Sequence, residues 1–242
     1  MNIPRSVFLL PVVFLGATAA FAIEQPGPPK PPVGDPFEDK FERTTLGDQW
    51  QIGGGIYTLH DGYLTAGEKE GNNHPGIFKI WKDFKDIELK FSFRFDGSKG
   101  FSIVFNDPGE PSVHSGHVVR LSIALKSVTL TDDKTGLMSL EWVDKRTDPK
   151  LKEAVEAVRA KTSRRFDYDF KPGQWYAVTM DVIGDEMSVS VDGKFVGKFN
   201  SPGFAHPTKK SFHFSISGRD ISLDNISATI PKKAEVAAKP GA

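Results

Sequence analysis

The chain has 242 residues and balances 31 Lys plus Arg against 31 Asp plus Glu. Such a balance creates no long-range field that would attract nucleic acid or an anionic membrane, so neither is an expected partner. The sequence has no cysteine, which excludes disulfides, thiolate metal sites and a lipid anchor attached through cysteine.

Residues 1–22 have the pattern of a signal peptide. Arg5 gives a positive start, residues 7–15 are mostly apolar, and Ala20 and Ala22 are small residues at the positions that a signal peptidase reads. No charge cluster of the kind that follows a membrane anchor comes next. We therefore expect an exported protein, periplasmic or extracellular, that is neither inserted in the membrane nor lipid-anchored.

Both ends of the remaining chain differ in composition from its middle. Residues 23–36 are rich in proline and predict an extended linker. Residues 231–242 are rich in Lys, Ala and Pro without an apolar period, which predicts a disordered tail. One folded domain is expected between them, over residues 37–230.

Within this domain apolar residues recur at every second position, which is typical of β-strands with one buried face. Glycine-containing turns separate the segments, and Asp192-Gly193 is a hairpin signal inside a three-stranded meander over residues 175–199. Many short strands without a repeat predict an all-β, two-sheet sandwich or jelly roll. The alternating segments are residues 87–95, 101–105, 119–125, 176–182, 187–191, 212–216 and 221–226.

One segment breaks the alternation. Leu151, Val155 and Val158 stand at helical spacing, behind Asp148 as N-cap and Pro149 at the first helical position. This pattern predicts a single amphipathic helix over about residues 148–161, inserted between strands.

Polar side chains alternate with the apolar rows, and some of them are candidate ligand-binding groups. If their strands are neighbours in one sheet, they converge on one face, where Arg and Asn donors suit a ligand rich in hydroxyls or a carboxylate. An ordinary solvated sheet face is an equally good interpretation. The candidates are Arg94, Asn106, Arg120 and Lys126.

The loop over residues 106–117 carries the densest chemistry in the chain. It contains Asp107, Glu110, His114 and His117, and loops commonly carry binding and catalytic groups. We take His114 and His117 as candidate catalytic residues and Asp107 as a further ligand-binding candidate. Two histidines three positions apart are also common in a surface turn, so no metal site is assigned to them.

Several catalytic motifs are missing from the sequence. It contains no nucleophile elbow, no zinc-protease motif and no phosphate-binding glycine loop. The alternating carboxylates Glu-x-Asp-x-Glu of a laminarinase-type retaining hydrolase are also missing, and that mechanism requires two paired carboxylates.

Six segments of the domain form a recognisable set: Phe37 to Trp50, Asp61 to Leu64, Phe84 to Arg94, Pro172 to Tyr176, Val191-Asp192-Gly193-Lys194 and Ile221 to Ile226. Together they resemble the 3-keto-disaccharide hydrolase domain family, of the concanavalin A-like lectin/glucanase superfamily. The resemblance implies a concanavalin-like jelly-roll sandwich acting on sugars, in particular cleaving glycosides at the bond to a 3-keto glucose. A 3-keto group acidifies the C2 proton, so one general base and one enolate-stabilising electrophile suffice to expel the C1 substituent.

Three functions remain open at this stage. The first is an enzyme on sugars, with His114 or His117 as base and Arg94 and Arg120 as oxygen stabilisers. The second is a glycan-binding module that uses the same face without chemistry, and the third is a structural envelope protein. Carbohydrate is the expected partner of the first two; no cofactor is required, although a structural calcium ion near Asp224 is compatible with the sequence.

Overall fold

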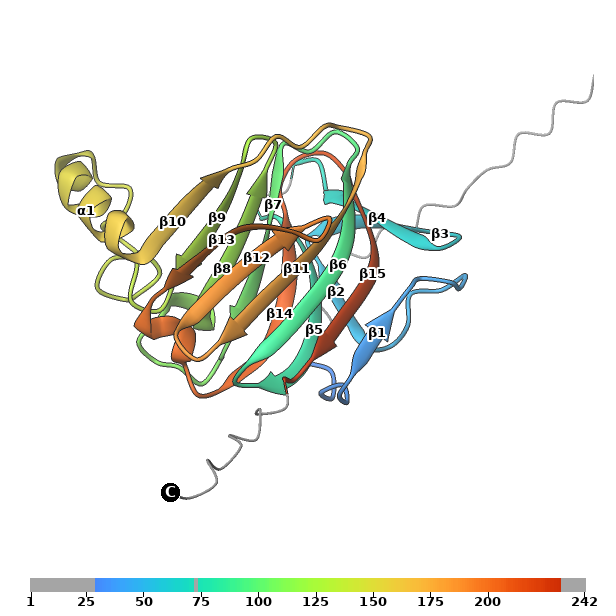
Figure 1. Cartoon of the computed structure of the whole chain (residues 1–242), viewed down its shortest axis with the longest axis horizontal. Coiled ribbons are helices and arrows are strands. Elements are labelled where there is room, and N and C mark those ends of the chain that lie inside the picture. Colours follow the sequence, from blue (N-terminus) through green and yellow to red (C-terminus); the bar gives the residue numbers. More distant parts are fainter. Residues whose placement is uncertain (1–28, 72–73, 232–242) are drawn as a thin grey trace, which may run out of the picture.

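The computed structural model describes residues 29–71 and 74–231, and its strands form two antiparallel sheets packed face to face (Figure 1). The predicted all-β sandwich is confirmed. The predicted signal peptide, residues 23–28 of the proline-rich linker and all but the first residue of the predicted tail lie outside the described residues.

The larger sheet has eight strands in the order β13-β12-β11-β6-β15-β4-β3, with β1 paired to β15. Its members are β1 (Phe37–Asp39), β3 (Gly55–His60), β4 (Tyr63–Glu68), β6 (Ile87–Phe95), β11 (Trp175–Ile183), β12 (Glu186–Val191), β13 (Lys194–Asn200) and β15 (Ile221–Thr229).

The smaller sheet has seven strands in the order β10-β9-β8-β7-β14-β5-β2. Its members are β2 (Trp50–Gly53), β5 (Gly76–Phe84), β7 (Gly100–Asn106), β8 (His117–Ala124), β9 (Ser127–Asp132), β10 (Ser163–Asp167) and β14 (Lys209–Ile216).

The apolar rows of both sheets meet in one core. Phe91 and Phe93 of β6 pack against Phe101 of β7, with ring centroids 6.3 and 5.0 Å apart. Phenylalanine suits this interior because it buries a large apolar area and carries no polar atom that needs a partner. The side chains between the apolar positions therefore point away from the core, and on the seven-stranded sheet they form the surface discussed below.

The predicted helix is present between β9 and β10. Its first turn is a 3-10 helix, Pro149–Leu151, which continues as α1 (Lys152–Thr162). The Asp148 carboxylate accepts a hydrogen bond from the Lys150 amide at 2.9 Å, which is the N-cap interaction expected from the sequence. The helix lies at one end of the sandwich and buries Val155 (Figure 1).

The meander β11-β12-β13 is also confirmed. Asp192 and Gly193 have φ values of 50° and 73°, the positive values that a two-residue type I′ hairpin turn requires. At the opposite end of the chain, Val33 donates its amide to the Trp81 carbonyl and the Lys82 ammonium contacts Asp35, so residues 33–35 lie against the sandwich.

In the part of the chain that the structure describes, no helix combines the length and the apolar character needed to cross a bilayer.

Candidate functional site

A polar pocket of about 400 Å³ lies on the outer face of the seven-stranded sheet. That volume is in the usual range for small-molecule sites, about 300–1,000 Å³. Its walls come from four adjacent strands, β5, β14, β7 and β8, and from the loops that follow β7 and β9. The lining residues are His74, Pro75, Ile77, Lys79, Asn106, His114, Ser115, His117, Arg120, Met138, Arg146, His213 and Ser215.

Strand register explains why these side chains meet. On β14, Phe212 and Phe214 belong to the core, so His213 between them points to the outer face. Its register partner on β5 is Lys79, and on β7 it is Val104. Asn106 of β7 is in turn opposite His117 of β8, where a bulge interrupts the ladder. Residues more than 100 positions apart in the sequence thus share one surface.

Among the residues that the structure describes, no carboxylate lines the pocket, although the neighbouring loop carries two. The Asp107 carboxylate turns away and accepts hydrogen bonds from Thr208 Oγ1 at 2.6 Å and from His206 Nε2 at 2.9 Å. Lys134 Nζ lies 2.9 Å from Glu110 Oε2 and donates to His206 Nδ1 at 2.8 Å. Both carboxylates therefore have their partners beneath the loop, and the described residues that line the cavity are neutral or basic.

Burial and hydrogen bonds act in opposite directions on the pKa of Asp107. Burial raises it, but the donors Thr208, His206 and the Gly109 amide outweigh burial and leave it below its ordinary value. For Glu110, hydrogen bonds from Ser112 and Lys134 lower the pKa to about 2. Both groups stay ionised and occupied at neutral pH, so neither is available as a proton acceptor in the pocket.

A buried ion pair holds Arg120 against His117. The Arg120 guanidinium lies 2.8 Å from Asp133 Oδ2, and its Nη2 is 3.2 Å from His117 Nδ1. A guanidinium has only donors, so His117 Nδ1 is the acceptor and the ring proton of the neutral imidazole is on Nε2. His117 therefore presents an N–H donor.

Asn106 holds His213 in the opposite tautomer. His213 Nδ1 lies 2.8 Å from Asn106 Oδ1, and Asn106 Nδ2 donates to the Ser115 carbonyl. Because the amide oxygen can only accept, Nδ1 of His213 carries the proton and Nε2 keeps its lone pair. The two rings are 5.9 Å apart between centroids, so a donor imidazole and an acceptor imidazole stand side by side.

Both imidazoles are neutral at neutral pH. Burial, and then the charge of Arg120, lowers the pKa of His117 to about 3. Burial, with the charge of Lys79, lowers the pKa of His213 well below its ordinary value. Burial also lowers the pKa of Lys79 and raises that of Asp133 beneath Arg120.

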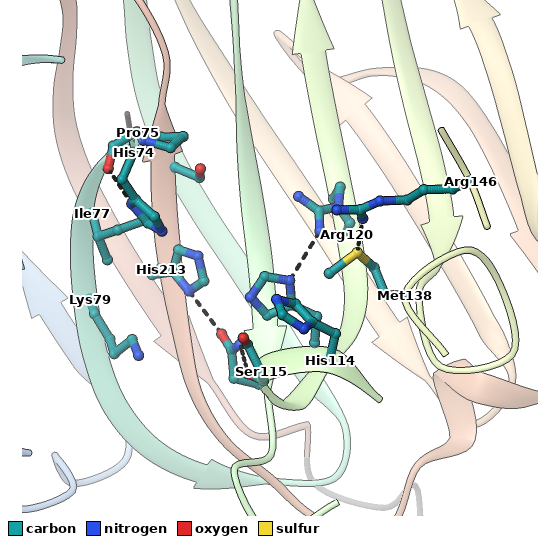
Figure 2. Close-up of a pocket in the computed structure, with 13 residues that line it drawn as sticks. His74, Pro75, Ile77, Lys79, His114, Ser115, Arg120, Met138, Arg146 and His213 are labelled. Atoms are coloured by element: carbon teal, nitrogen blue, oxygen red, sulfur yellow. Dashed lines mark hydrogen bonds between the residues drawn. The ribbon is translucent and has the colours of Figure 1, made fainter. Parts of the chain in front are cut away.

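Of the candidate residues taken from the sequence, four line this pocket: Asn106, His114, His117 and Arg120. Figure 2 places His114 and Arg120 on one side of the pocket, with His213 and Lys79 across from them. Their functional roles remain predictions.

The expectation that the four strand candidates share one face is wrong for two of them, Arg94 and Lys126, and the loop candidate Asp107 does not line the pocket either. Arg94 is on β6, in the other sheet, where it pairs with Asp96 and lies over the Trp175 ring. Lys126 is in the β8–β9 turn and pairs with Asp169. Asp107 follows Asn106 directly but is buried below the loop. Alternation places a residue on one side of a strand but does not assign the strand to a sheet.

Several pocket residues were not singled out from the sequence, among them His213, Lys79 and Arg146. His213 lies between the core residues Phe212 and Phe214, and Lys79 lies between Phe78 and Ile80, but nothing local joined β5 and β14 to the histidine loop. Arg146 belongs to the irregular segment before the helix, where no period exists to place a side chain.

Two other parts of the molecule carry polar groups that could form a binding site. A hollow of about 600 Å³ lies near Glu68, Glu70, Arg219 and Asp220, but Glu68 is engaged with the Gly218 amide of the adjacent turn. Among the described residues, no group of three or more His, Asp or Glu is arranged to hold a metal ion. The Asp224 carboxylate, near which calcium was considered, accepts hydrogen bonds from the backbone and side-chain amides of Asn225.

Residues 36–228 match the sequence model of a family described as the 3-keto-alpha-glucoside-1,2-lyase-like domain. The chain belongs to this family. The match covers both sheets and the pocket, and it confirms the resemblance found in the sequence. A search of curated proteins by sequence gives no match.

Solved structures with a similar fold include a sialidase, a laminarinase and a domain in a carbohydrate-bound form. A sialidase superposes with a TM-score of 0.55 at 14% identity, covering 82% of this chain and 19% of the sialidase. A laminarinase from Flavobacterium sp. UMI-01 gives 0.53 at 13% identity, covering 80% and 98%. The exoplasmic/lumenal domain of VIP36, in a form bound to Ca²⁺ and Man3GlcNAc, gives 0.53 at 13% identity, covering 79% and 90%.

These identities establish the fold alone. The chain is a jelly-roll sandwich of the type found in glycosidases and carbohydrate-binding proteins, as predicted, and it spans about a fifth of the sialidase it resembles.

Proposed function

We propose that the pocket binds a glycoside and that the chain cleaves 3-keto glycosides by elimination across C1 and C2. The observation that carries this proposal is the pair of neutral imidazoles with opposite tautomers, His213 as acceptor and His117 as donor, 5.9 Å apart in a pocket without carboxylates. Membership of the 3-keto-alpha-glucoside-1,2-lyase-like family supports it.

The two imidazoles match the two requirements of this reaction. His213 Nε2 takes the proton from C2, and the electron pair of that C–H bond passes into the ketone to give an enolate. His117 Nε2–H donates a hydrogen bond to the enolate oxygen at C3, as a neutral imidazole can. The electron pair of the enolate then forms the C1–C2 double bond while the C1–O bond breaks, and the leaving alkoxide takes the proton that His213 Nε2 accepted, which restores the neutral base.

The low pKa values of these histidines are compatible with this role because proton transfer creates two charges in the same pocket. The positive groups that disfavour a cationic imidazole also favour the anionic enolate beside it. Asn106 orients His213 through Nδ1, in the way that a third group orients the base in other catalytic arrangements. We therefore assign the base to His213, and the sequence-based candidate His117 to the electrophile.

Hydrolysis through a carboxylate pair is disfavoured by the same geometry. Retaining and inverting glycosidases generally need an acid and a second carboxylate flanking the scissile bond. Asp107 and Glu110 are the nearest loop acids, and both are occupied by partners outside the cavity.

The test uses 4-nitrophenyl 3-keto-glucosides of both anomers, deuterated at C2. Wild-type protein is expected to release nitrophenol together with a 1,2-unsaturated 3-keto sugar, detected by mass spectrometry, with a primary isotope effect. His213→Gln and His117→Gln are each expected to lower kcat by roughly 100-fold or more, the usual contribution of a general acid or base.

His60→Gln is the matched control, because His60 stacks on Tyr63 in the other sheet. It should keep wild-type kcat, and all variants should keep the wild-type melting temperature. Turnover of neither anomer by folded wild-type protein would exclude the catalytic proposal, and full activity of His213→Gln would exclude His213 as the base.

A glycan-binding module without chemistry is the second candidate, supported by the likeness to the VIP36 domain in its Man3GlcNAc-bound form. The same deuterated substrates separate the two. Binding with no exchange of the C2 deuteron into solvent and no product favours a binding module; exchange favours the enzyme.

We also propose that the protein is exported, on the basis of the signal-peptide pattern in residues 1–22. Amino-terminal sequencing of the protein from a cell-envelope or culture fraction is expected to begin at Ile23. Recovery of the uncleaved chain from the cytoplasm would contradict export.

A further inference from the structure

The positive charge of the pocket is local. The whole chain has a formal net charge of zero, and many of its described cations are neutralised by carboxylates, such as Arg43 by Asp39 and Lys198 by Glu186. Lys79 and Arg146 both line the pocket, and within the described ranges neither has a carboxylate within ion-pair distance. The pocket of a protein with no net charge therefore contains two cations, Lys79 and Arg146, that no described carboxylate pairs with.

The two arginines of the pocket share a single buried acid. Asp133 is paired directly with Arg120, and the charge of Arg146 also acts on it. Three cations, Lys79, Arg120 and Arg146, therefore line the cavity, and none of the described residues that line it is a carboxylate. Figure 2 shows Arg120 and Arg146 on one side of the pocket and Lys79 on the other.

The guanidinium of Arg146 has more N–H donors than its contact with Met138 uses. Its Nη1 contacts Met138 Sδ at 2.6 Å, a weak acceptor, which leaves its other N–H groups available to a ligand. A planar guanidinium matches carboxylate, sulfate and phosphate oxygens in a two-point geometry. Across the cavity, the Lys79 ammonium is half-buried over the Trp81 ring, 5.1 Å from its centroid, rather than extended into water.

We propose that the natural glycoside carries an anionic substituent, a carboxylate, sulfate or phosphate at C6 of the sugar ring, and that Arg146 and Lys79 bind it. The inference rests on the proposed function, since C1, C2 and C3 must face His213 and His117. The acidic group must then be elsewhere on the sugar. The exocyclic C6 is the position that can carry all three anions, because its primary alcohol can be oxidised to a carboxylate or esterified with sulfate or phosphate.

An anion bound beside Lys79 also offsets the electrostatic cost of burying the Lys79 ammonium. Burial of Lys79 in the pocket disfavours its charged form and lowers its pKa. A bound anion compensates that cost and makes the interaction stronger than it would be between exposed groups.

The experiment measures affinity with glycosides that have no keto group, so that no enolate forms and only ground-state binding is observed. Calorimetry compares methyl glucoside with methyl glucuronide, methyl glucoside 6-sulfate and methyl glucoside 6-phosphate, at low and high salt. At least one anionic glycoside is expected to bind about tenfold or more tightly than the neutral one, the size of one charged hydrogen bond. The preference should shrink as salt rises.

Two variants and a matched control locate the effect. Arg146→Gln and Lys79→Gln should each reduce the ratio of anionic to neutral affinity several-fold. Arg159→Gln removes an arginine from α1 that pairs with Glu156, outside the pocket, and should keep the full ratio. Which of the three anions binds best identifies the substituent.

Equal affinity for neutral and anionic glycosides would overturn the inference, as would a preference that survives both pocket variants. If wild-type protein nevertheless turns over neutral 3-keto glucosides, the proposed function stands and only the anion site fails. If it binds none of these glycosides and turns over no 3-keto glucoside, both proposals fail together.

Discussion

Arg120 has three roles that only its surroundings reveal. Its guanidinium pairs with Asp133, donates to His117 Nδ1, and lowers the pKa of His117 by its charge, after the larger effect of burial. The sequence indicated that Arg120 points to the outer face of its strand. It could not indicate the tautomer of His117, because that depends on which atom faces Nδ1, and this contact crosses a β-bulge.

The tautomer assignment can be checked without any substrate. In wild-type protein, ¹⁵N chemical shifts of the His117 ring should report protonation at Nε2 and a neutral ring down to about pH 4, because the pKa is about 3. Arg120→Gln removes a nearby cation, so the pKa of His117 should rise toward its ordinary value of 6.5.

Asn106→Leu is the companion variant, because it leaves Arg120 in place and releases His213 instead. It should leave the His117 titration unchanged. A His117 that titrates near pH 6.5 in wild-type protein would contradict the described electrostatics.

At the scale of elements, the loop between β7 and β8 separates acids from histidines. It turns Asp107 and Glu110 inward and His114 toward the pocket, and the turn depends on Gly116. This residue has φ of 69°, and a Cβ there would lie 2.4 Å from the Asp107 carbonyl oxygen. The sequence identified the loop as chemically dense. The sequence did not predict that the acids turn inward and His114 turns toward the pocket. The partners of Asp107, Thr208 and His206, come from a segment about 100 residues later in the chain.

Gly116→Ala should therefore displace the loop. We expect a loss of more than about 1 kcal/mol in the free energy of unfolding, measured with urea, because a positive φ and a backbone clash coincide. Turnover and glycoside affinity should fall as well, since His114 and His117 flank this residue.

Gly173→Ala is the control, because Gly173 has φ of 78° but open space at its Cβ position. This variant should lower the free energy of unfolding only by the cost of placing alanine at a positive φ, and it should leave ligand binding unchanged. Equal destabilisation by the two variants would mean that the close approach to Asp107 is unimportant.

At the scale of the whole molecule, the pocket makes folding sensitive to acid. The folded protein keeps His117 neutral down to a pKa of about 3, whereas an unfolded chain protonates it near 6.5. Between these values the unfolded state binds more protons, so stability is complete above pH 6.5 and falls as the pH decreases toward 3. His213 acts in the same direction, and Asp133, whose pKa burial raises, acts in the opposite one.

The comparison of His117→Gln with wild-type protein isolates one of these groups. Urea unfolding between pH 7 and pH 4 should give a shallower fall in the variant, by up to about 1.4 kcal/mol per pH unit for one proton. His60→Gln should follow the wild-type curve. Parallel curves for His117→Gln and wild-type protein would show that His117 is not buried as a neutral ring.

The sequence by itself determined the fold class, the inserted helix with its Asp148 cap, the Asp192-Gly193 hairpin and the family. Each of these is local or repetitive: a period of two, a cap, a turn that needs positive φ, or motifs readable along the chain. The order of strands in the two sheets was decided only by the tertiary structure, because a strand's alternation is the same whichever sheet it joins. That order removed Arg94 from the pocket, brought His213 and Lys79 to Asn106 and His117, and so decided which side chains can act together.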